Sequence, residues 1–108
     1  MFITLETVRE HCRIDADDTS EDSLLTIYVG AAKRHIEKWT RRNLYETNAD
    51  VGFDADEDRL LLDDDIRLVI LLLVGHWYAN REAVSEQKAS EIPLAVDALL
   101  QPYRVYGL

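Results

Sequence analysis

The chain has 108 residues, 47% of them hydrophobic, with only four Gly and two Pro, which places it outside the disordered and low-complexity classes. Its 21 acidic and 12 basic side chains leave a formal net charge of -9, the wrong sign for a protein that grips nucleic acid through phosphate contacts. The length suits one domain, so residues 1–108 are expected to fold around a single core.

Several other classes of protein are disfavoured by local features. Cys12 is the one cysteine, which excludes an intramolecular disulfide and four-thiolate zinc sites and fits a reducing cytoplasm. The opening MFITLETVREHC lacks the basic start and apolar block of a signal peptide. The most apolar run, residues 68–74, is far shorter than the roughly twenty residues of a membrane span. We therefore expect no association with a membrane.

Two helices are expected in the N-terminal half. Thr4 stands at an N-cap position, and apolar residues follow at helical spacing, so a short helix is expected over about 4–13. The next stretch, DADDTSED, has Thr19 three residues before Asp22, a near-match to a capping box. Acids crowded at a helix N-terminus complement its dipole, which predicts a second helix over about 20–42.

Alternating aspartates twice imitate the start of a calcium loop, once from Asp15 and once from Asp54. In the first stretch Ser20 and Thr26 stand where an EF-hand needs its glycine and its bidentate glutamate. In the second stretch Arg59 occupies the glycine position. Metal binding is the weaker interpretation in both places, and no metal or cofactor is expected.

The second helix is expected to have an apolar face and a basic face. The apolar positions recur every three or four residues: Leu25, Tyr28, Ala32, Ile36 and Trp39. The basic face is lined by Arg34, Lys38 and Arg41, with Lys33 and Arg42 beside them. Positive charge in the last turns suits a helix C-terminus. The basic face is either a solvated surface or a contact with an acidic surface on a neighbouring copy.

Residues 43–65 carry nine acids and one arginine, without helical periodicity before Leu60. We expect a long acidic surface loop over 43–63, in which residues 44–45 and 60–62 are compatible with a loose hairpin. Loops of this length are usually disordered or functional. The acids Asp50, Asp54, Asp56, Glu57 and Asp58 lie in the middle of this loop. Asp63 and Asp64 join Arg34, Lys38, Arg41 and Arg42 as candidates for subunit contacts.

The segment DDDIRLVILLLVGHWYANRE begins with three aspartates at a cap and first turn and continues with apolar residues on nearly every face. This pattern predicts a buried central helix over about 64–81. Gly75 costs about 1 kcal/mol inside a helix, which indicates a close approach by another backbone. The expected core side chains of the two long helices are Leu25, Tyr28, Ile36, Trp39, Ile66, Ile70, Leu73 and Trp77.

The polar residues after this apolar run have a catalytic and a structural interpretation. An enzyme would pair His76 with Asn80 and use Cys12 as a nucleophile. Nothing in the sequence places Cys12 near His76, and there is no Gly-rich phosphate loop. Trp77 instead continues the buried stripe, while polar tips on either side reach solvent or a carbonyl. The end of a buried helix is the better interpretation, and no catalysis is expected.

Pro93 suits the first turn of a final short helix over about 93–101, which Pro102 ends. Chain ends are usually polar, but the tail 102–108 holds two tyrosines and an arginine, residue types enriched in binding hot spots. The tail either docks on a partner or folds back on its own core. Its candidate docking residues are Tyr103, Arg104, Val105, Tyr106 and Leu108. The whole pattern predicts an all-α bundle of about four helices.

Four segments taken in order resemble the head-tail connector (adaptor) proteins of long-tailed bacteriophages and prophages, a family also associated with DNA packaging. These segments are TLETVREHCRID, AAKRHIEKWTRRNL, IRLVILLLVGHWYANREAV and IPLAVDALLQPYR. The similarity covers nearly the whole chain except the acidic stretch from about 45 to 58. No single segment is chemically diagnostic, but the four together are fairly specific.

The resemblance implies a structural virion protein, without catalysis, that is assembled in the host cytoplasm. It would form a homo-oligomeric ring beneath the portal at the head-tail junction, of roughly twelve copies if the ring matches the portal. The ring would extend the DNA channel after packaging and bind the portal on one side and a downstream joining or tail protein on the other. Its acidity would let DNA pass without sequence-specific binding, because carboxylates repel phosphates. The candidates for facing the channel or the next protein are the loop acids Asp50, Asp54, Asp56, Glu57 and Asp58.

A second class of function stays open at this point. An acidic soluble binding module of the DNA-mimic type would occupy the basic groove of a partner protein. A mimic needs its acids spaced along a regular surface, whereas here they cluster in expected loops. A salt-sensitive complex with a DNA-binding protein, without affinity for a portal, would favour this alternative.

Overall fold

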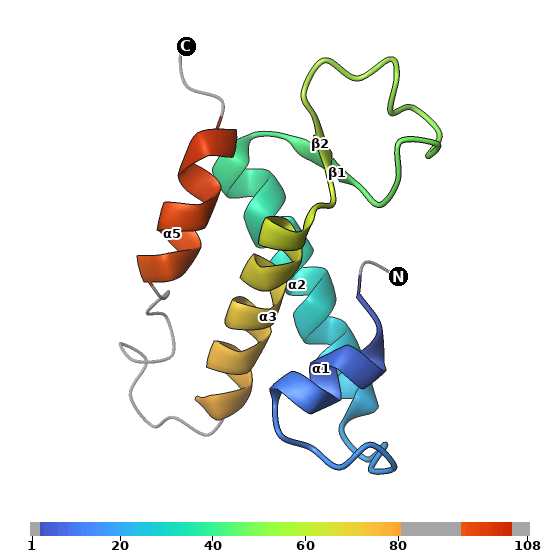
Figure 1. The fold of residues 1–108 in the computed structure, drawn as a ribbon, viewed down its shortest axis with the longest axis vertical. Coiled ribbons are helices and arrows are strands. Elements are labelled where there is room, and N and C mark those ends of the chain that lie inside the picture. Colours follow the sequence, from blue (N-terminus) through green and yellow to red (C-terminus); the bar gives the residue numbers. More distant parts are fainter. Residues whose placement is uncertain (1–2, 81–93, 105–108) are drawn as a thin grey trace.

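The computed structural model describes residues 3–80 and 94–104, and these residues are mostly helical (Figure 1). The elements in chain order are α1 (Leu5–His11), α2 (Asp22–Thr40), β1 (Asn43–Tyr45), β2 (Arg59–Leu61), α3 (Asp64–Ala79), α5 (Leu94–Leu100) and the 3₁₀ helix η1 (Gln101–Tyr103). The expectation of a mostly helical fold is confirmed. The fold is not purely all-α, because two short strands pair between α2 and α3.

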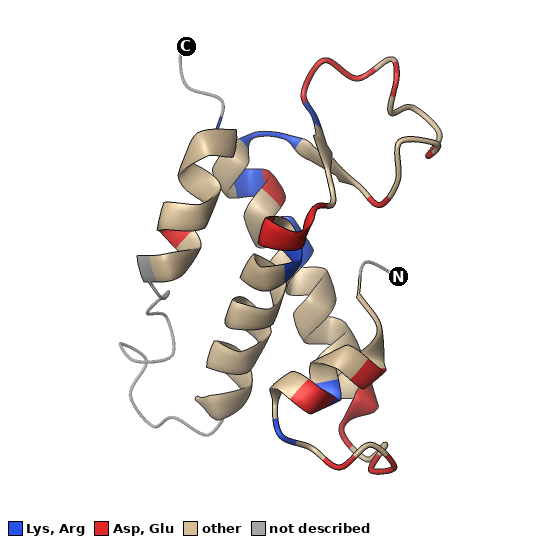
Figure 2. Cartoon of the chain, viewed as in Figure 1, with Lys and Arg blue, Asp and Glu red and all other residues tan. Residues whose placement is uncertain are grey.

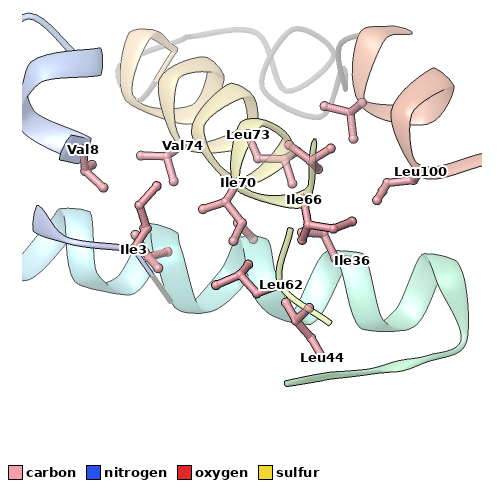
Figure 3. Packing of buried hydrophobic residues seen from close by; sticks show 14 of the residues in the cluster. Ile3, Val8, Ile36, Leu44, Leu62, Ile66, Ile70, Leu73, Val74 and Leu100 are labelled. Atoms are coloured by element: carbon pink, nitrogen blue, oxygen red, sulfur yellow. The ribbon is translucent and has the colours of Figure 1, made fainter. Parts of the chain in front are cut away.

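Helix α3 lies at the centre of the fold and packs against α1, α2 and α5. Five of its side chains are fully buried: Ile66, Val69, Ile70, Leu73 and Val74. Figure 3 shows several of them between α3 and α2. Complete burial of a side chain of this size stabilises the folded state by about 1.5–3 kcal/mol, so this row of residues is the main support of the fold.

The aromatic residues expected in the core lie at its edge. Leu25 and Ile36 of α2 are fully buried, whereas Tyr28, Trp39 and Trp77 are partly buried and pack against the cluster. The rings of Tyr28 and Trp77 have centroids 6.0 Å apart and are tilted by 47°. Large aromatic side chains with a polar tip are seldom enclosed completely, so this position at the rim of the core is physically reasonable.

Two expectations for α3 are corrected by the structure. The helix is not buried on all sides, because Leu68 is 44% exposed and Leu71 and Leu72 are only partly buried. The close neighbour of Gly75 is a side chain and not a backbone: a Cβ atom at this position would lie 2.8 Å from Nε2 of His11. The glycine therefore makes room for the imidazole at the end of α1.

Of the two N-terminal helix caps expected from the sequence, the cap of α1 is formed and that of α2 is not. Oγ1 of Thr4 accepts a hydrogen bond from the backbone N–H of Thr7 at 3.3 Å, which confirms the expected N-cap of α1. The expected capping box of α2 is not formed, because Glu21 occupies the N-cap without a side-chain cap bond. The carboxylate of Asp22 instead binds Nη1 of Arg9, at 2.8 and 2.9 Å. The side chain of Arg9 is only 13% exposed, so its charge needs this partner.

The strands β1 and β2 run parallel, with Leu44 opposite Leu60 at the centre of the register. The prediction of a loose hairpin is wrong, because a hairpin is antiparallel and these strands are parallel. Residues 46–58 carry the chain back to the start of the ladder. A connection of about a dozen residues is the minimum for a parallel pair. The backbone N–H of Leu44 donates to Oε2 of Glu37 at 2.9 Å, so a side chain of α2 covers the other edge of β1.

Candidate functional site

The basic face of α2 consists of Arg34, Lys38 and Arg41, all exposed on the C-terminal half of the helix. Within the described part of the chain, Arg34 and Lys38 have neither a hydrogen bond nor an ion pair. A hollow of about 400 Å³ lies over this end of the helix. Its lining residues are Arg34, Glu37, Lys38, Arg41, Arg42 and Asn43. This face therefore presents positive charge on the surface of the described chain.

Arg42 belongs to the fold itself. Its Nε donates a hydrogen bond to the backbone carbonyl of Tyr103, and its Nη1 lies 3.5 Å from the carbonyl oxygen of Arg59. These contacts tie the end of α2 to η1 and β2. Of the residues considered for subunit contacts, Arg42 thus has an internal role, which separates it from the basic face.

The three aspartates at the start of α3 differ in what they contact. Asp63 is the N-cap, without a side-chain cap bond, and Asp64 pairs with Arg67 at 2.9 Å on the surface. An exposed pair of this kind stabilises by only about 0–1 kcal/mol. Asp65 accepts a hydrogen bond from the hydroxyl of Tyr103. Sequence reasoning missed this contact, because no local signal relates the two residues.

The loop formed by residues 46–58, here named the strand-connecting loop, is organised by two of its own carboxylates. Asp56 accepts hydrogen bonds from Nδ2 of Asn43 at 2.8 Å, from the hydroxyl of Tyr45 at 2.8 Å and from the N–H of Asp58 at 2.9 Å. These hydrogen bonds lower the pKa of Asp56, and the bond from Asn43 makes the largest contribution. Asp56 therefore fastens the loop to β1 in its charged form.

Asp50 has the same role in the N-terminal part of the strand-connecting loop. It accepts from the N–H of Glu46 at 2.9 Å and from the N–H and hydroxyl of Thr47, at 3.2 and 2.9 Å. The hydrogen bonds from Thr47 are the largest cause of a lowered pKa at Asp50. The turn that follows includes Gly52 at φ 90°, a backbone conformation that glycine adopts readily.

The remaining acids of the loop are turned outward. Asp54, Glu57 and Asp58 are exposed, and Val51 among them is 98% exposed. The ring of Phe53 packs edge-on against Tyr45, with centroids 5.5 Å apart. Of the five acids proposed for this loop, two therefore hold its shape and three are exposed to solvent, as is the side chain of Val51.

The described start of the C-terminal tail is fastened to the fold. Tyr103 contacts Arg42 and Asp65, and the guanidinium of Arg104 lies 4.8 Å from the centroid of the Trp39 ring. A cation above an aromatic face is attracted by the ring quadrupole. The other three docking candidates, Val105, Tyr106 and Leu108, lie outside the described residues. Between the two interpretations of the tail, Tyr103 and Arg104 thus follow the one in which it folds back on the core.

Among the polar groups considered for catalysis, Asn80 has a local structural contact, whereas the buried Nε2 of His76 has no hydrogen-bond partner within the described residues. Nδ2 of Asn80 donates to the carbonyl of His76 at 2.8 Å, a contact that ends α3. Burial raises the pKa of the Cys12 thiol, which keeps it in the less nucleophilic protonated form. No three His, Cys, Asp or Glu side chains in residues 3–80 and 94–104 form a group suited to a metal ion. None of the described helices is long and apolar enough to span a bilayer.

Charge is distributed unevenly over the molecule (Figure 2). Acidic residues gather around α1 and the turn before α2, and again on the strand-connecting loop and the start of α3. Basic residues gather at the C-terminal part of α2 and the turn after it. The described surface therefore has regions of opposite charge.

Comparison with protein families identifies a family to which the chain is similar over nearly its whole length. Residues 2–104 match the model of the family described as phage gp6-like head-tail connector protein. Comparisons with curated proteins and with solved structures found no match. The family match confirms the resemblance inferred from the four sequence segments, and it also spans the acidic stretch that the resemblance left out.

Proposed function

This chain belongs to the phage gp6-like head-tail connector family, and from that membership we propose that it assembles into a ring between the portal and the tail of a virion. The ring extends the DNA channel below the portal and joins the filled head to the next joining or tail protein. The observation that carries the proposal is the family match over residues 2–104, because it includes every described element. The function is structural.

The distribution of charge supports a ring. A cyclic assembly needs a heterologous interface, in which one face of a subunit meets a different face of the next. The basic face of α2 and the outward acids of the strand-connecting loop are two such faces on one chain. Asp63 and Asp64 lie close to the loop in sequence and extend its acidic side. Exposed ion pairs are individually weak, so their role is to set orientation.

The acidity of the chain also suits a channel for DNA. A net charge of -9 distributed around a ring gives a field that repels phosphates. DNA then passes without adhering to the wall, as ejection requires. Because a ring that continues the portal channel is expected to share its symmetry, roughly twelve copies are the natural number.

The proposal is tested on the purified chain by light scattering after size exclusion, with electron microscopy of the same fractions. Closed rings with a central hole, formed by the chain alone or on added portal protein of the same phage, are the expected result. A chain that stays monomeric even with portal present contradicts the proposal. A salt-sensitive complex with a DNA-binding protein would then favour the DNA-mimic function.

A further inference from the structure

The outward face of α2 has two chemically different halves. Ile27, Ala31, Arg34, Lys38 and Arg41 recur at spacings of four and three residues, so they lie along one stripe of the helix, and all are exposed. The first half of the stripe is aliphatic, with Ile27 66% exposed, and the second half is the basic face. We name the whole stripe the outer face of α2.

A glycine lies beside the aliphatic half of this outer face. A Cβ atom added to Gly30 would meet no atom of the chain within 4 Å, and Gly30 is not among the residues with positive φ. Glycine weakens a helix interior relative to alanine, and nothing within the described fold requires it here. Because Gly30 has no side chain and Ala31 has only a methyl group, the surface of the helix is low next to the exposed side chain of Ile27.

The strand-connecting loop carries exposed aliphatic and acidic side chains, which complement the aliphatic and basic halves of the outer face of α2. Three large hydrophobic side chains of the described residues are strongly exposed: Ile27, Val51 and Leu68. Val51 lies on the loop, which also carries the exposed acids Asp54, Glu57 and Asp58. The internal bonds of Asp50 and Asp56 hold the loop in shape before any partner arrives. A loop ordered in advance loses less conformational entropy on binding.

We propose that the strand-connecting loop of one subunit docks on the outer face of α2 of a second copy of this chain. Val51 lies against Ile27 and the low surface at Gly30, and the acids of the loop face the basic half of the stripe. The proposal rests on the ring proposed above and names the contact that builds it. Each subunit uses its loop once and its outer face once, so the contact is heterologous, and it closes a ring when the rotation between neighbours is a whole fraction of a full turn.

The two kinds of contact have different roles. Ion pairs at an exposed rim stabilise weakly and respond to salt, so they orient the loop along the helix. Removal of aliphatic surface from water supplies most of the affinity. Figure 1 shows the loop projecting away from the helices at one end of the molecule, where an adjacent subunit can reach it.

Charge reversal tests the contact without knowledge of any other partner. One variant carries Arg34→Glu and Lys38→Glu on the outer face, and the other carries Asp54→Lys and Glu57→Lys on the loop. Each variant alone is expected to lose assembly at least tenfold in the concentration required. An equimolar mixture is expected to recover assembly, because each reversed surface then meets its reversed partner and each native surface its native one. Far-ultraviolet circular dichroism checks that both variants fold.

Cross-linking tests the proximity of the aliphatic parts. In a Cys12→Ala background, Ala31→Cys and Val51→Cys in one chain are expected to give a ladder of oligomers with a short bis-maleimide under ring-forming conditions. A mixture of the two single-cysteine chains is expected to stop at dimers. The matched control pairs Ala31→Cys with Asp17→Cys, an exposed position on the turn before α2, and is expected to give no ladder.

The outcomes separate the two proposals. Rings that form equally well from each charge-reversed variant, or that give no cross-link between positions 31 and 51, overturn this contact and leave the ring standing. A native chain that forms no ring, alone or with portal, overturns both. Reversal of Arg34 and Lys38 that weakens retention of duplex DNA but leaves assembly unchanged assigns the basic half to DNA and also overturns the contact.

Discussion

Arg41 adopts a left-handed conformation, with φ 60° and ψ 32°, at the residue that ends α2. An L-residue in this region costs about 1–2 kcal/mol, and glycine usually occupies such positions. We expect Arg41→Gly to be more stable than Arg41→Ala by about 1 kcal/mol, because both lose the side chain and only glycine relieves the strain. Chemical denaturation of the two variants measures the difference. Equal stabilities would show that the backbone at this position is not strained.

Tyr103 ties η1 to the first turn of α3 through its hydrogen bond to Asp65. This bond, together with burial and the charges of Asp65 and Asp63, raises the pKa of Tyr103 to about 12. We expect Tyr103→Phe to lower the free energy of unfolding by about 1 kcal/mol at neutral pH, the usual worth of one hydrogen bond.

The raised pKa of Tyr103 also predicts a pH dependence. The folded state holds this phenol proton more tightly than the unfolded state does, so the contribution is complete below pH 10, the ordinary pKa of tyrosine, and is lost as the pH rises to about 12. A titration followed by tyrosinate absorbance should show one group near 12 that is absent from Tyr103→Phe. If the native and variant titrations differ by a group of ordinary pKa, the bond to Asp65 is not made in solution.

At the scale of elements, the strand-connecting loop depends on Asp56. We expect Asp56→Ala to release Asn43 and Tyr45 and to speed hydrogen exchange of the amides in the β1–β2 ladder, while the helices keep their protection. Asp54→Ala is the matched control, because within the described residues its side chain has no partner. Equal exchange in the two variants would contradict the role of Asp56.

The lowered pKa of Asp56 gives this loop its own pH dependence. A carboxylate with a depressed pKa contributes its full stabilisation above its ordinary pKa, which is 3.8 for aspartate, and loses it as the pH falls through the lower folded value. We therefore expect protection of the ladder amides to fall in acid in the native chain, and to change less in Asp56→Ala. Hydrogen exchange at a series of acidic pH values, corrected for the intrinsic rate, measures this.

At the scale of the whole molecule, the described start of the C-terminal tail is held by the fold, and residues 105–108 are the part that we propose for docking. We expect deletion of residues 105–108 to leave stability unchanged and to abolish binding to the portal. Deletion of residues 103–108 should also lower stability, because it removes the contacts of Tyr103 with Asp65 and Arg42 and of Arg104 with Trp39.

Thermal unfolding measures the stability of the two truncated chains, and a pull-down with portal protein measures their binding. The shorter deletion is the informative one, because any loss of portal binding then occurs in a chain that retains its fold. Undiminished binding after removal of residues 105–108 would show that the tail is not the docking element.

Much of the helical architecture could be predicted from the sequence, because the signals for a helix are local. Thr4 caps α1, apolar residues at spacings of three and four bury Leu25, Ile36, Ile66 and Ile70 on facing helices, and four segments identify the family. These features depend on neighbours within about one turn, which a sequence displays directly.

The tertiary structure decided which charged residues make contacts within the fold and which remain exposed on its surface. The parallel pairing of β1 with β2 and the internal bonds of Arg42, Asp56 and Asp65 join residues far apart in the chain. No periodicity encodes such pairs, because they form only after the helices have packed and brought their ends together. The sequence alone therefore determined a mostly helical connector with segregated charge, while packing determined that Arg34, Lys38 and three loop acids face outward.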